Sequence, residues 1–304
     1  MSKYKKLTKI ARKALLNDEY ETAIVNYETA FEEYSLLNDV VDYGISQHKN
    51  NSLLKAYEIF TDITIKIPSY AYAYFALAMV CEDLGKTSEA IVNYELAIKY
   101  QPDFKEAYFN LGCLYDRLEK FDESIKNYEK TLEYDNEHFW AHLNLGAHLE
   151  KQEEDEQALE HMLKALEINR YKKMVNYNLG VIYTKLKQYD KALHHYLKEL
   201  KCEEDAYYMV YLNIGLLYKD IYKDYDKAMH YYLKGIASNK EDYVLWYNLG
   251  CLYVVLKQEE DAYKCFYYSC SKDETLLDFM KQDEELIEFR TSDIYKKLLE
   301  KIEI

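Results

Sequence analysis

The chain of 304 residues carries 39 Lys and Arg against 54 Asp and Glu, which gives a net charge of −15 at neutral pH. A chain this acidic lacks the electrostatic footprint that binds nucleic acid or an anionic membrane surface. It has only 8 glycines and 2 prolines, the residues that sheet proteins, Rossmann folds and barrels need at their turns. With 49% hydrophobic and 31% charged residues, the composition predicts a folded, all-α protein.

The sequence also bears on the cellular compartment. The longest apolar run, 70–81, is 12 residues long, which is too short to span a bilayer. The first 16 residues lack the continuous apolar core of a signal peptide. The six cysteines form no CxxC pair and mostly occupy apolar helix positions. We therefore expect reduced thiols in the core of a cytoplasmic protein.

Small residues recur along the chain with a period of 34 or 35 residues. The first series is Gly44, Ala78, Gly112, Gly146, Gly180, Gly215 and Gly250. A second small residue follows 12 residues later, or 13 after Gly215, and in the first pair Ala11 stands in place of the glycine. This second series is Ala23, Ala56, Ala90, Ser124, Ala158, Ala192, Ala228 and Ala262. A large side chain follows four residues after each member of the second series: Tyr27, Phe60, Tyr94, Tyr128, Met162, Tyr196, Tyr232 and Phe266.

The two series predict a repeating pair of helices. The small residues mark the place where the two helices approach closely, and the large side chains fill the space around that crossing. One such pair cannot bury its own apolar face, so neighbouring pairs must stack into a solenoid.

The spacing of residue types within one repeat resembles a known family. Trp246-x2-Leu249-Gly250-x2-Tyr253, followed by Ala262 and Phe266, is similar to the tetratricopeptide repeat. The resemblance is strong over about 70–270 and looser in the first two pairs. It implies a right-handed α-solenoid of about eight helix-turn-helix repeats. We expect a superhelix over 1–275, with repeats near 4–36, 37–70, 71–104, 105–138, 139–172, 173–207, 208–242 and 243–275.

The last stretch, 276–304, departs from the repeat pattern. Its apolar residues and charged surface predict short helices that cap the final hydrophobic face. The apolar residues are Phe279, Leu286, Phe289, Tyr295, Leu298 and Leu299.

No catalytic residues, cofactor or metal site emerge from the sequence, so we expect a protein that is not an enzyme. His138 and His142 have the helical spacing of joint metal ligands, and His194 and His195 are adjacent, but neither set has a third ligand at a recognisable spacing. His161 and His195 occupy equivalent places in successive repeats, which indicates surface packing.

An asparagine recurs in the first helix of five consecutive predicted helix pairs. Asparagine is a poor helix former because its amide competes for backbone groups. These residues are Asn110, Asn144, Asn178, Asn213 and Asn248. A side-chain amide can donate to a carbonyl and accept from an N–H, which is what an extended peptide offers. Asparagines of neighbouring helix pairs, about 10 Å apart, would meet roughly every third residue of such a segment. The alternative is that each amide bonds only to the adjacent repeat.

Beside these asparagines runs a row of aromatic and aliphatic residues: Phe75, Phe109, Leu143, Tyr177, Leu212 and Tyr247. The row could line a groove with the asparagines or only seal neighbouring repeats. The resemblance extends to repeat arms whose asparagines hold extended chains, and it implies a protein or peptide partner in the concave groove. We expect that segment to carry apolar and basic residues, since Glu82, Asp116 and Glu150 lie near the same side. A signalling-peptide-sensing regulator and a structural subunit of a larger assembly are the alternatives.

Overall fold

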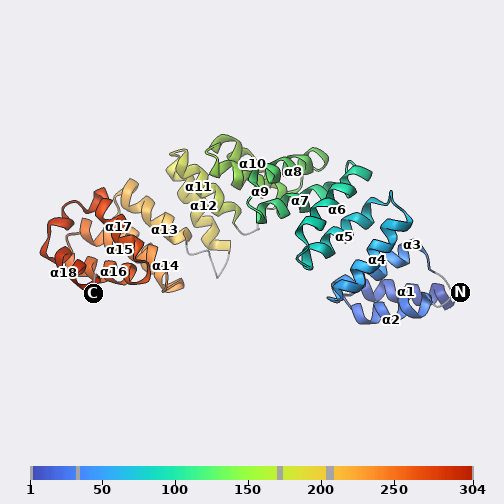
Figure 1. Cartoon of the computed structure of the whole chain (residues 1–304). Helices are drawn as coiled ribbons and strands as arrows, with labels where there is room; N and C mark the ends of the chain where they lie inside the picture. The colour runs from blue at the N-terminus through green and yellow to red at the C-terminus, as the bar shows by residue number, and fades with distance from the viewer. Residues whose placement is uncertain (1–2, 32–34, 170–173, 203–208, 303–304) are drawn as a thin grey trace. The chain divides into compact units, whose positions relative to one another are not determined.

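The computed structural model describes residues 3–31, 35–169, 174–202 and 209–302 (Figure 1). Across these ranges the chain is helical and contains no strand, which confirms the predicted all-α repeat solenoid. The chain divides into two compact units, Met1–Leu145 and Gly146–Ile304. This division falls inside one helix, whereas the predicted boundary between repeats and cap lies at 275/276.

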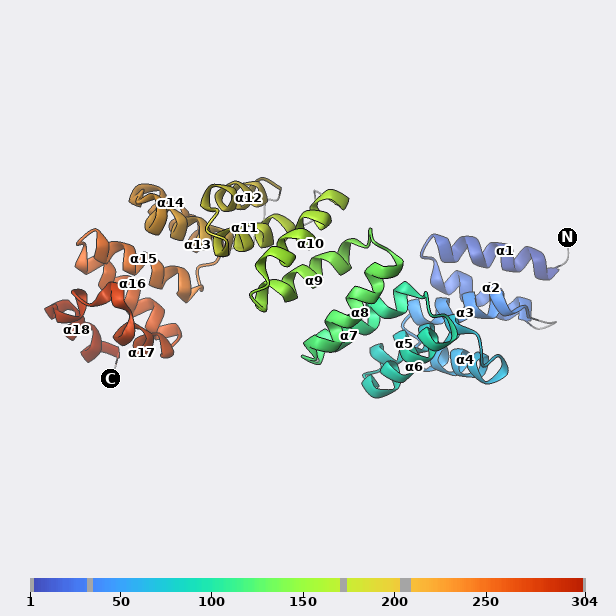
Figure 2. The same cartoon turned by 90° about the horizontal axis from the view of Figure 1, so that it is seen from above.

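Helices of the first unit follow one another in pairs, and the members of each pair lie side by side (Figures 1 and 2). The pairs are α1 (Lys3–Leu16) with α2 (Tyr20–Phe31), α3 (Leu37–Lys49) with α4 (Leu53–Lys66), α5 (Ala71–Asp83) with α6 (Thr87–Tyr100), and α7 (Lys105–Arg117) with α8 (Phe121–Tyr134). Helix α9 (Phe139–Lys151) contains the division between the two units.

The second unit continues with α10 (Asp155–Ile168), α11 (Val175–Lys185), α12 (Tyr189–Cys202), α13 (Met209–Leu216), α14 (Tyr225–Ser238), α15 (Tyr243–Val255) and α16 (Glu259–Lys272). A π-helical segment, η1 (Leu217–Tyr222), prolongs α13. The chain then forms α17 (Thr275–Gln282), the 3-10 turns η2 (Glu284–Leu286) and η3 (Phe289–Thr291), and α18 (Asp293–Ile302).

The small and large residues meet at the helix crossings, as the two series predict. Ser124 and Tyr128 of α8 are fully buried, and a Cβ added to Gly112 of α7 would lie 2.9 Å from the Tyr128 ring. The equivalent small residues of the second helices are likewise inaccessible to solvent, and the equivalent large residues are at most 1% exposed. Close packing at these crossings therefore stabilises each helix pair.

A short turn with one residue of positive φ joins the two helices of each pair. Its residue with positive φ is Asp18, Asn51, Gly85, Glu119, Glu153, Lys187, Lys223 or Lys257. In the turn at Gly85, the Lys86 N–H donates to the Cys81 carbonyl at 2.8 Å, as in a Schellman motif. Only one of the eight residues is glycine, so the turns tolerate the backbone strain that other residues carry in this region.

The seventh pair has 13 positions from Gly215 to Ala228, whereas the sixth has 12 from Gly180 to Ala192. In the sixth, the Gln188 N–H donates to the carbonyl of Tyr183, five residues back. In the seventh, the Asp224 N–H donates to the carbonyl of Tyr218, six residues back. The π-helical η1 therefore absorbs the residue that makes the Gly215–Ala228 spacing 13 rather than 12.

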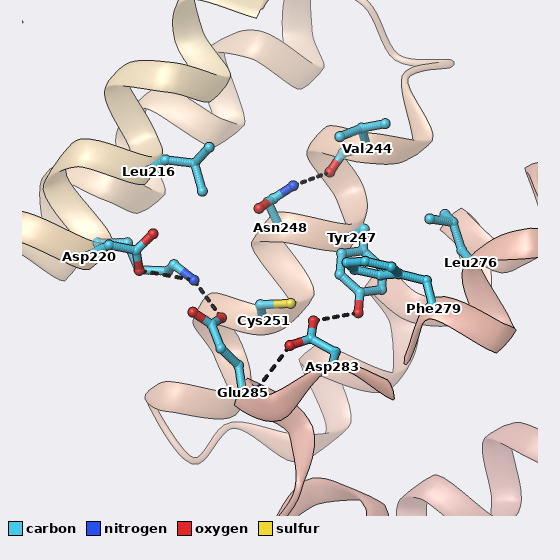
Figure 3. A pocket seen from close by; sticks show the side chains of 11 residues that line it. Leu216, Asp220, Val244, Tyr247, Asn248, Cys251, Leu276, Phe279, Asp283 and Glu285 are labelled. Carbon is cyan, nitrogen blue, oxygen red and sulfur yellow. Dashed lines mark hydrogen bonds and ion pairs between the residues drawn. The ribbon is translucent and has the colours of Figure 1, made fainter. Parts of the chain in front are cut away.

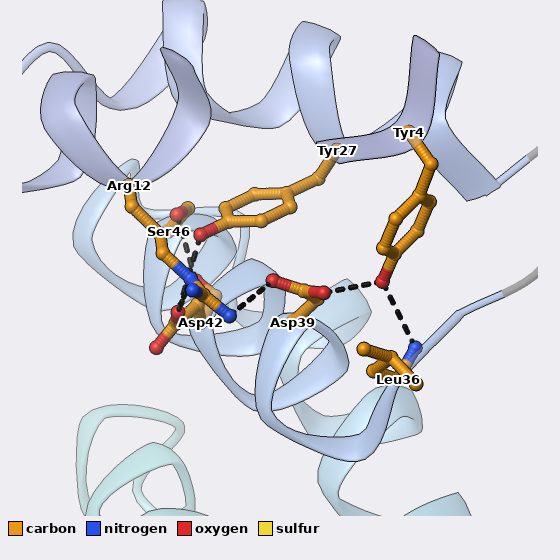
Figure 4. A network of polar contacts seen from close by, with 7 residues as sticks. All are labelled: Tyr4, Arg12, Tyr27, Leu36, Asp39, Asp42 and Ser46. Atoms are coloured by element: carbon orange, nitrogen blue, oxygen red, sulfur yellow. Dashed lines mark hydrogen bonds and ion pairs between the residues drawn. The ribbon is translucent and has the colours of Figure 1, made fainter. Parts of the chain in front are cut away.

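A polar network fastens the N-terminal pair to α3 (Figure 4). Arg12 of α1 contacts Asp39 at 2.7 Å and Asp42 at 3.3 Å, and the buried Asp39 also accepts a hydrogen bond from the Tyr4 hydroxyl. The Tyr27 hydroxyl donates to Asp42 at 3.2 Å. Because its charge is paired and hydrogen-bonded, Asp39 is tolerated at 1% exposure.

The segment after α16 packs on the last repeat. Leu286, Phe289 and Leu298 are buried in one cluster with Phe266 of α16. Phe279 of α17 differs from the expectation, because 57% of its surface is exposed. No helix within the described ranges is both long and apolar enough to cross a membrane.

Candidate binding surface along the first helices

In the first unit, two of the asparagines donate to a buried tyrosine of the preceding repeat. Asn144 Nδ2 donates to the Tyr128 hydroxyl at 3.0 Å, and that hydroxyl donates to Asp116 Oδ2 at 2.5 Å. Asn110 Nδ2 donates to the Tyr94 hydroxyl at 3.4 Å, and Tyr94 in turn donates to Glu82. These hydrogen bonds hold each asparagine amide with Nδ2 toward the tyrosine, so Oδ1 points to the other side.

The three asparagines of the second unit differ from one another. Burial raises the pKa of the Tyr196 hydroxyl, and this rise is partly offset by Thr184, whose Oγ1 lies 3.3 Å away, and by an interaction with Asn213. Asn248 Nδ2 donates to the Val244 carbonyl of its own helix at 2.8 Å. Asn178 follows a repeat in which Met162 replaces the tyrosine, so that repeat offers no hydroxyl. Asn178 is thus the asparagine that repeat stacking explains least.

In the second and third repeats, the residue at the position of the asparagines fits the large residue 15 or 16 positions before it. Asp42 takes this position after Tyr27 and accepts its hydroxyl proton. Ala76 takes it after Phe60, which has no hydroxyl to satisfy. This pattern supports the stacking alternative for Asn110, Asn144 and Asn213, whose amides serve a buried hydroxyl.

The aromatic and aliphatic row packs mainly inside its own repeats. Leu143, Leu212 and Tyr247 are buried. Phe109 lies 5.8 Å from the Tyr128 ring and 4.5 Å from His138, measured between ring centroids. Phe75 and Tyr177 are half-buried and contact Tyr94 and Tyr196 in the same manner. The row therefore has a packing role, and its half-buried members Phe75, Phe109 and Tyr177 expose part of their rings.

The carboxylates expected to attract a basic partner have partners within the chain. Glu82 pairs with Arg117, and Glu150 Oε1 lies 2.5 Å from Lys185 Nζ. Asp116 accepts the Tyr128 hydroxyl proton. These internal pairs reduce the negative charge that Glu82, Asp116 and Glu150 present to a ligand.

Three of the asparagines line cavities that open to the surface, which sequence reasoning did not foresee. Asn110 lines one cavity with Met79 and Cys113, and Asn213 lines another with Leu216 and Ile221. Asn248 lines a cavity of about 460 Å³ closed on one side by the cap (Figure 3). A hydrophobic pattern gives the face on which these residues lie but not the void between them.

The histidines have structural partners. His138 Nδ1 accepts from the Ala141 N–H at 3.1 Å, and His142 Nε2 lies 3.0 Å from the Asn136 carbonyl. His195 Nδ1 donates to Asn176 Oδ1 at 3.0 Å, and burial lowers the pKa of its imidazole to about 4. Within the described ranges, no group of three His, Cys, Asp or Glu side chains is placed to hold a metal ion.

Five of the cysteines are free thiols: Cys81, Cys113, Cys251, Cys265 and Cys270. Burial raises the pKa of the Cys81 thiol to about 11 and that of Cys265 to about 12. Since the thiolate is the reactive form, these cysteines act as small core residues.

Stacked helix pairs with a small residue at each crossing define an α-solenoid of short helical repeats. Comparison with known families identifies the type of repeat. A model described as TPR repeat matches residues 81–119, and a model described as tetratricopeptide repeat matches 105–138 and 175–201. The chain therefore contains tetratricopeptide repeats.

Solved structures share this fold. YrrB, described as a TPR protein with an unusual peptide-binding site, aligns at 22% identity and a TM-score of 0.56 over 61% of this chain and 94% of its own. The C-terminal part of a TPR repeat-containing protein from Cytophaga hutchinsonii aligns at 19% identity and a TM-score of 0.62, covering 77% of this chain and 96% of its own. PilF from Pseudomonas aeruginosa aligns at 19% identity and a TM-score of 0.56, covering 67% and 91%. None of the curated proteins matches this chain in sequence.

Proposed function

We propose that this chain is a non-catalytic scaffold that binds an extended segment of a partner protein along its first helices. The observation that carries the proposal is that Asn110, Asn213 and Asn248 each line a cavity that is open to the surface. An amide at the wall of an open cavity can pair with the backbone of an entering segment. The peptide-binding site that YrrB is described as having supports the same use of the fold.

The hydrogen bonds from asparagine amides to tyrosine hydroxyls add to this proposal. Where Nδ2 is held by a tyrosine hydroxyl, as in Asn110 and Asn144, Oδ1 is pre-oriented as an acceptor for a ligand N–H. Pre-orientation reduces the entropy that a side chain loses on binding, and therefore strengthens the hydrogen bond it makes. The same contacts then serve both repeat stacking and ligand binding.

The remaining parts of the proposal follow from composition. With a net charge of −15, the chain repels the phosphate backbone, so we propose a protein partner and no nucleic acid or membrane surface. The free thiols favour a reducing compartment, and we propose the cytoplasm.

Capture of the partner from a cell extract by the tagged full chain, with identification by mass spectrometry, tests the proposal. We expect the Asn178→Ala/Asn248→Ala variant to lose most of the captured material, because both amides lie on first helices and neither supports a tyrosine. Asn93→Ala/Asn127→Ala is a matched control, since each of these amides donates to the carbonyl four residues back on a second helix.

The outcomes separate the function classes. One protein captured through a short extended segment supports the scaffold, whereas free short peptides would indicate a peptide-sensing regulator. A stoichiometric protein that is retained equally by both variants would contradict the peptide surface and indicate a structural subunit. Turnover of a substrate by the purified chain would overturn the non-catalytic assignment.

A further inference from the structure

A cavity of about 460 Å³ lies between the seventh and eighth repeats and the C-terminal cap (Figure 3). Apolar walls come from Leu216 of α13 and from Leu276 and Phe279 of α17. The polar walls come from Asp220 in the π-helical η1 and from Asp283 and Glu285 beside η2. All of these residues belong to the second compact unit.

The π-helix shapes this cavity. Lys219 lies in this segment with its side chain only 4% exposed, and its Nζ contacts Glu285 Oε2 at 2.5 Å and Asp220 Oδ1 at 3.2 Å. Burial lowers the pKa of Lys219, but the hydrogen bond with Glu285 and the charge of Asp220 outweigh burial and raise it. The ammonium is therefore retained as the internal partner of two carboxylates.

Negative charge exceeds positive charge at the cavity wall, where three carboxylates face one ammonium. Asp220 is 41% exposed and Glu285 is 46% exposed, so each presents part of its carboxylate to the cavity and solvent. Asp283 accepts the Tyr247 hydroxyl at 2.7 Å and the Glu285 N–H at 3.0 Å. Because the apolar walls restrict water, a cation is attracted more strongly here than at an open surface.

A buried hydroxyl without a partner lies close to the same carboxylates. Tyr232 is fully buried, and its hydroxyl forms no hydrogen bond within the described part of the chain. It interacts electrostatically with Asp220 and Glu285, both of which line the cavity. A buried hydroxyl without a hydrogen bond is costly.

The equivalent hydroxyls of Tyr94 and Tyr128 each have a carboxylate and an asparagine as partners. In this repeat, Asp220 is paired with Lys219, and the Asn248 amide donates to Val244 instead. The two kinds of partner that satisfy the other tyrosines are thus both engaged elsewhere in this repeat.

We propose that this cavity receives an arginine side chain from the bound segment. A guanidinium has five donors in a planar fork, so it can reach several acceptors at once, and its aliphatic stem suits the apolar wall. The exposed ring of Phe279 offers a face on which the guanidinium stacks. An anionic group is excluded by the three carboxylates. The inference rests on the proposed function, since the arginine belongs to the segment that the first helices bind.

The test uses single amino-acid probes with the full chain, so it does not depend on the identity of the partner. The probes are Nα-acetyl-arginine methylamide and its citrulline counterpart, which has nearly the same shape and no charge. Binding is followed by the methyl resonances of Leu216, Val244 and Leu276. We expect the arginine probe to shift these resonances and the citrulline probe to bind at least about tenfold more weakly.

Asp220→Asn is expected to lower the affinity for the arginine probe by about fivefold or more, because it removes one carboxylate from the cavity wall. Asp278→Asn is the matched control, since Asp278 lies on α17 next to Phe279, with its side chain 78% exposed and outside the cavity. Phe279→Ala is a second variant, chosen because this exposed ring can be removed with little cost to the fold.

Three results would overturn the proposal: equal affinity for arginine and citrulline, shifts at other methyl groups alone, or unchanged binding by both Asp220→Asn and Phe279→Ala. Partner capture by the wild-type chain together with any of these results would leave the proposed function standing and remove only the arginine site. Arginine binding without partner capture would support the arginine site and contradict the proposed function.

Discussion

Replacement of Gly215 by alanine is expected to lower the free energy of unfolding of the second unit by about 2–3 kcal/mol. A Cβ at this position would overlap the ring of Tyr232, which is fully buried, so the ring would have to shift further than in any milder contact. The overlap must outweigh the gain of about 1 kcal/mol that alanine brings to a helix interior. Urea unfolding followed by Trp246 fluorescence in a Trp140→Phe background reports on this unit.

Gly112→Ala is the matched control for this prediction. Its added Cβ would lie 2.9 Å from the Tyr128 ring, a milder contact that a small shift of the ring relieves. The expected loss is below about 1 kcal/mol, because helix propensity offsets the remaining strain. The third repeat accommodates a natural alanine, Ala78, at the equivalent position. Equal losses for Gly112→Ala and Gly215→Ala would contradict the graded packing described for these crossings.

The Asn178→Ala/Asn248→Ala double variant is expected to bind the captured segment at least about tenfold more weakly than the wild type. Each amide can make two hydrogen bonds to a peptide backbone, and each bond contributes roughly 0.5–1.5 kcal/mol net. Isothermal titration calorimetry with the captured segment measures the effect. The melting temperature should hardly change, because neither amide supports a tyrosine and alanine is the better helix former.

Asn144→Ala separates the stacking role from the binding role. Its amide donates to the Tyr128 hydroxyl, so its removal should lower the free energy of unfolding by about 0.5–1.5 kcal/mol. Stability losses of the same size in the Asn178→Ala/Asn248→Ala variant, with unchanged affinity, would show that all five asparagines serve stacking alone.

Much of the fold could be predicted because the helix crossings repeat. A small residue and a large one must recur with the period of the repeat, as at Gly112 and Tyr128, since every pair buries the same kind of contact. The periodicity therefore gave the helix pairs and their buried faces. It also placed the asparagines on the first helices, because the side-chain direction follows from helical geometry.

Other features could not be predicted because they depend on local geometry. The turns with positive φ mostly use charged residues such as Glu119 and Lys187 in place of glycine, so composition gave no signal for them. The 13-residue spacing after Gly215 was visible in the sequence, but its resolution as a π-helix was not. The burial of Lys219 and the exposure of Phe279 depend on how the cap packs, which no residue pattern specifies.

The candidate site shows the same limit. The sequence identified five amides without indicating that Asn110 and Asn144 would each hold a tyrosine of the preceding repeat. One signal was available: Ala76 follows Phe60, whereas polar residues follow the tyrosines, with Asn178 after Met162 as the exception. The cavities beside Asn213 and Asn248 arise from packing between repeats and have no such signal.

Site-specific photocross-linking tests the central claim most directly, namely that the partner lies along the first helices. A benzophenone amino acid replaces Asn178 on α11 in one protein, and Leu163 on the neighbouring second helix α10, where it is 42% exposed, in another. Irradiation with the captured partner should cross-link it through position 178 and leave position 163 unmodified. Cross-linking through position 163 alone would contradict the account and assign binding to the second helices.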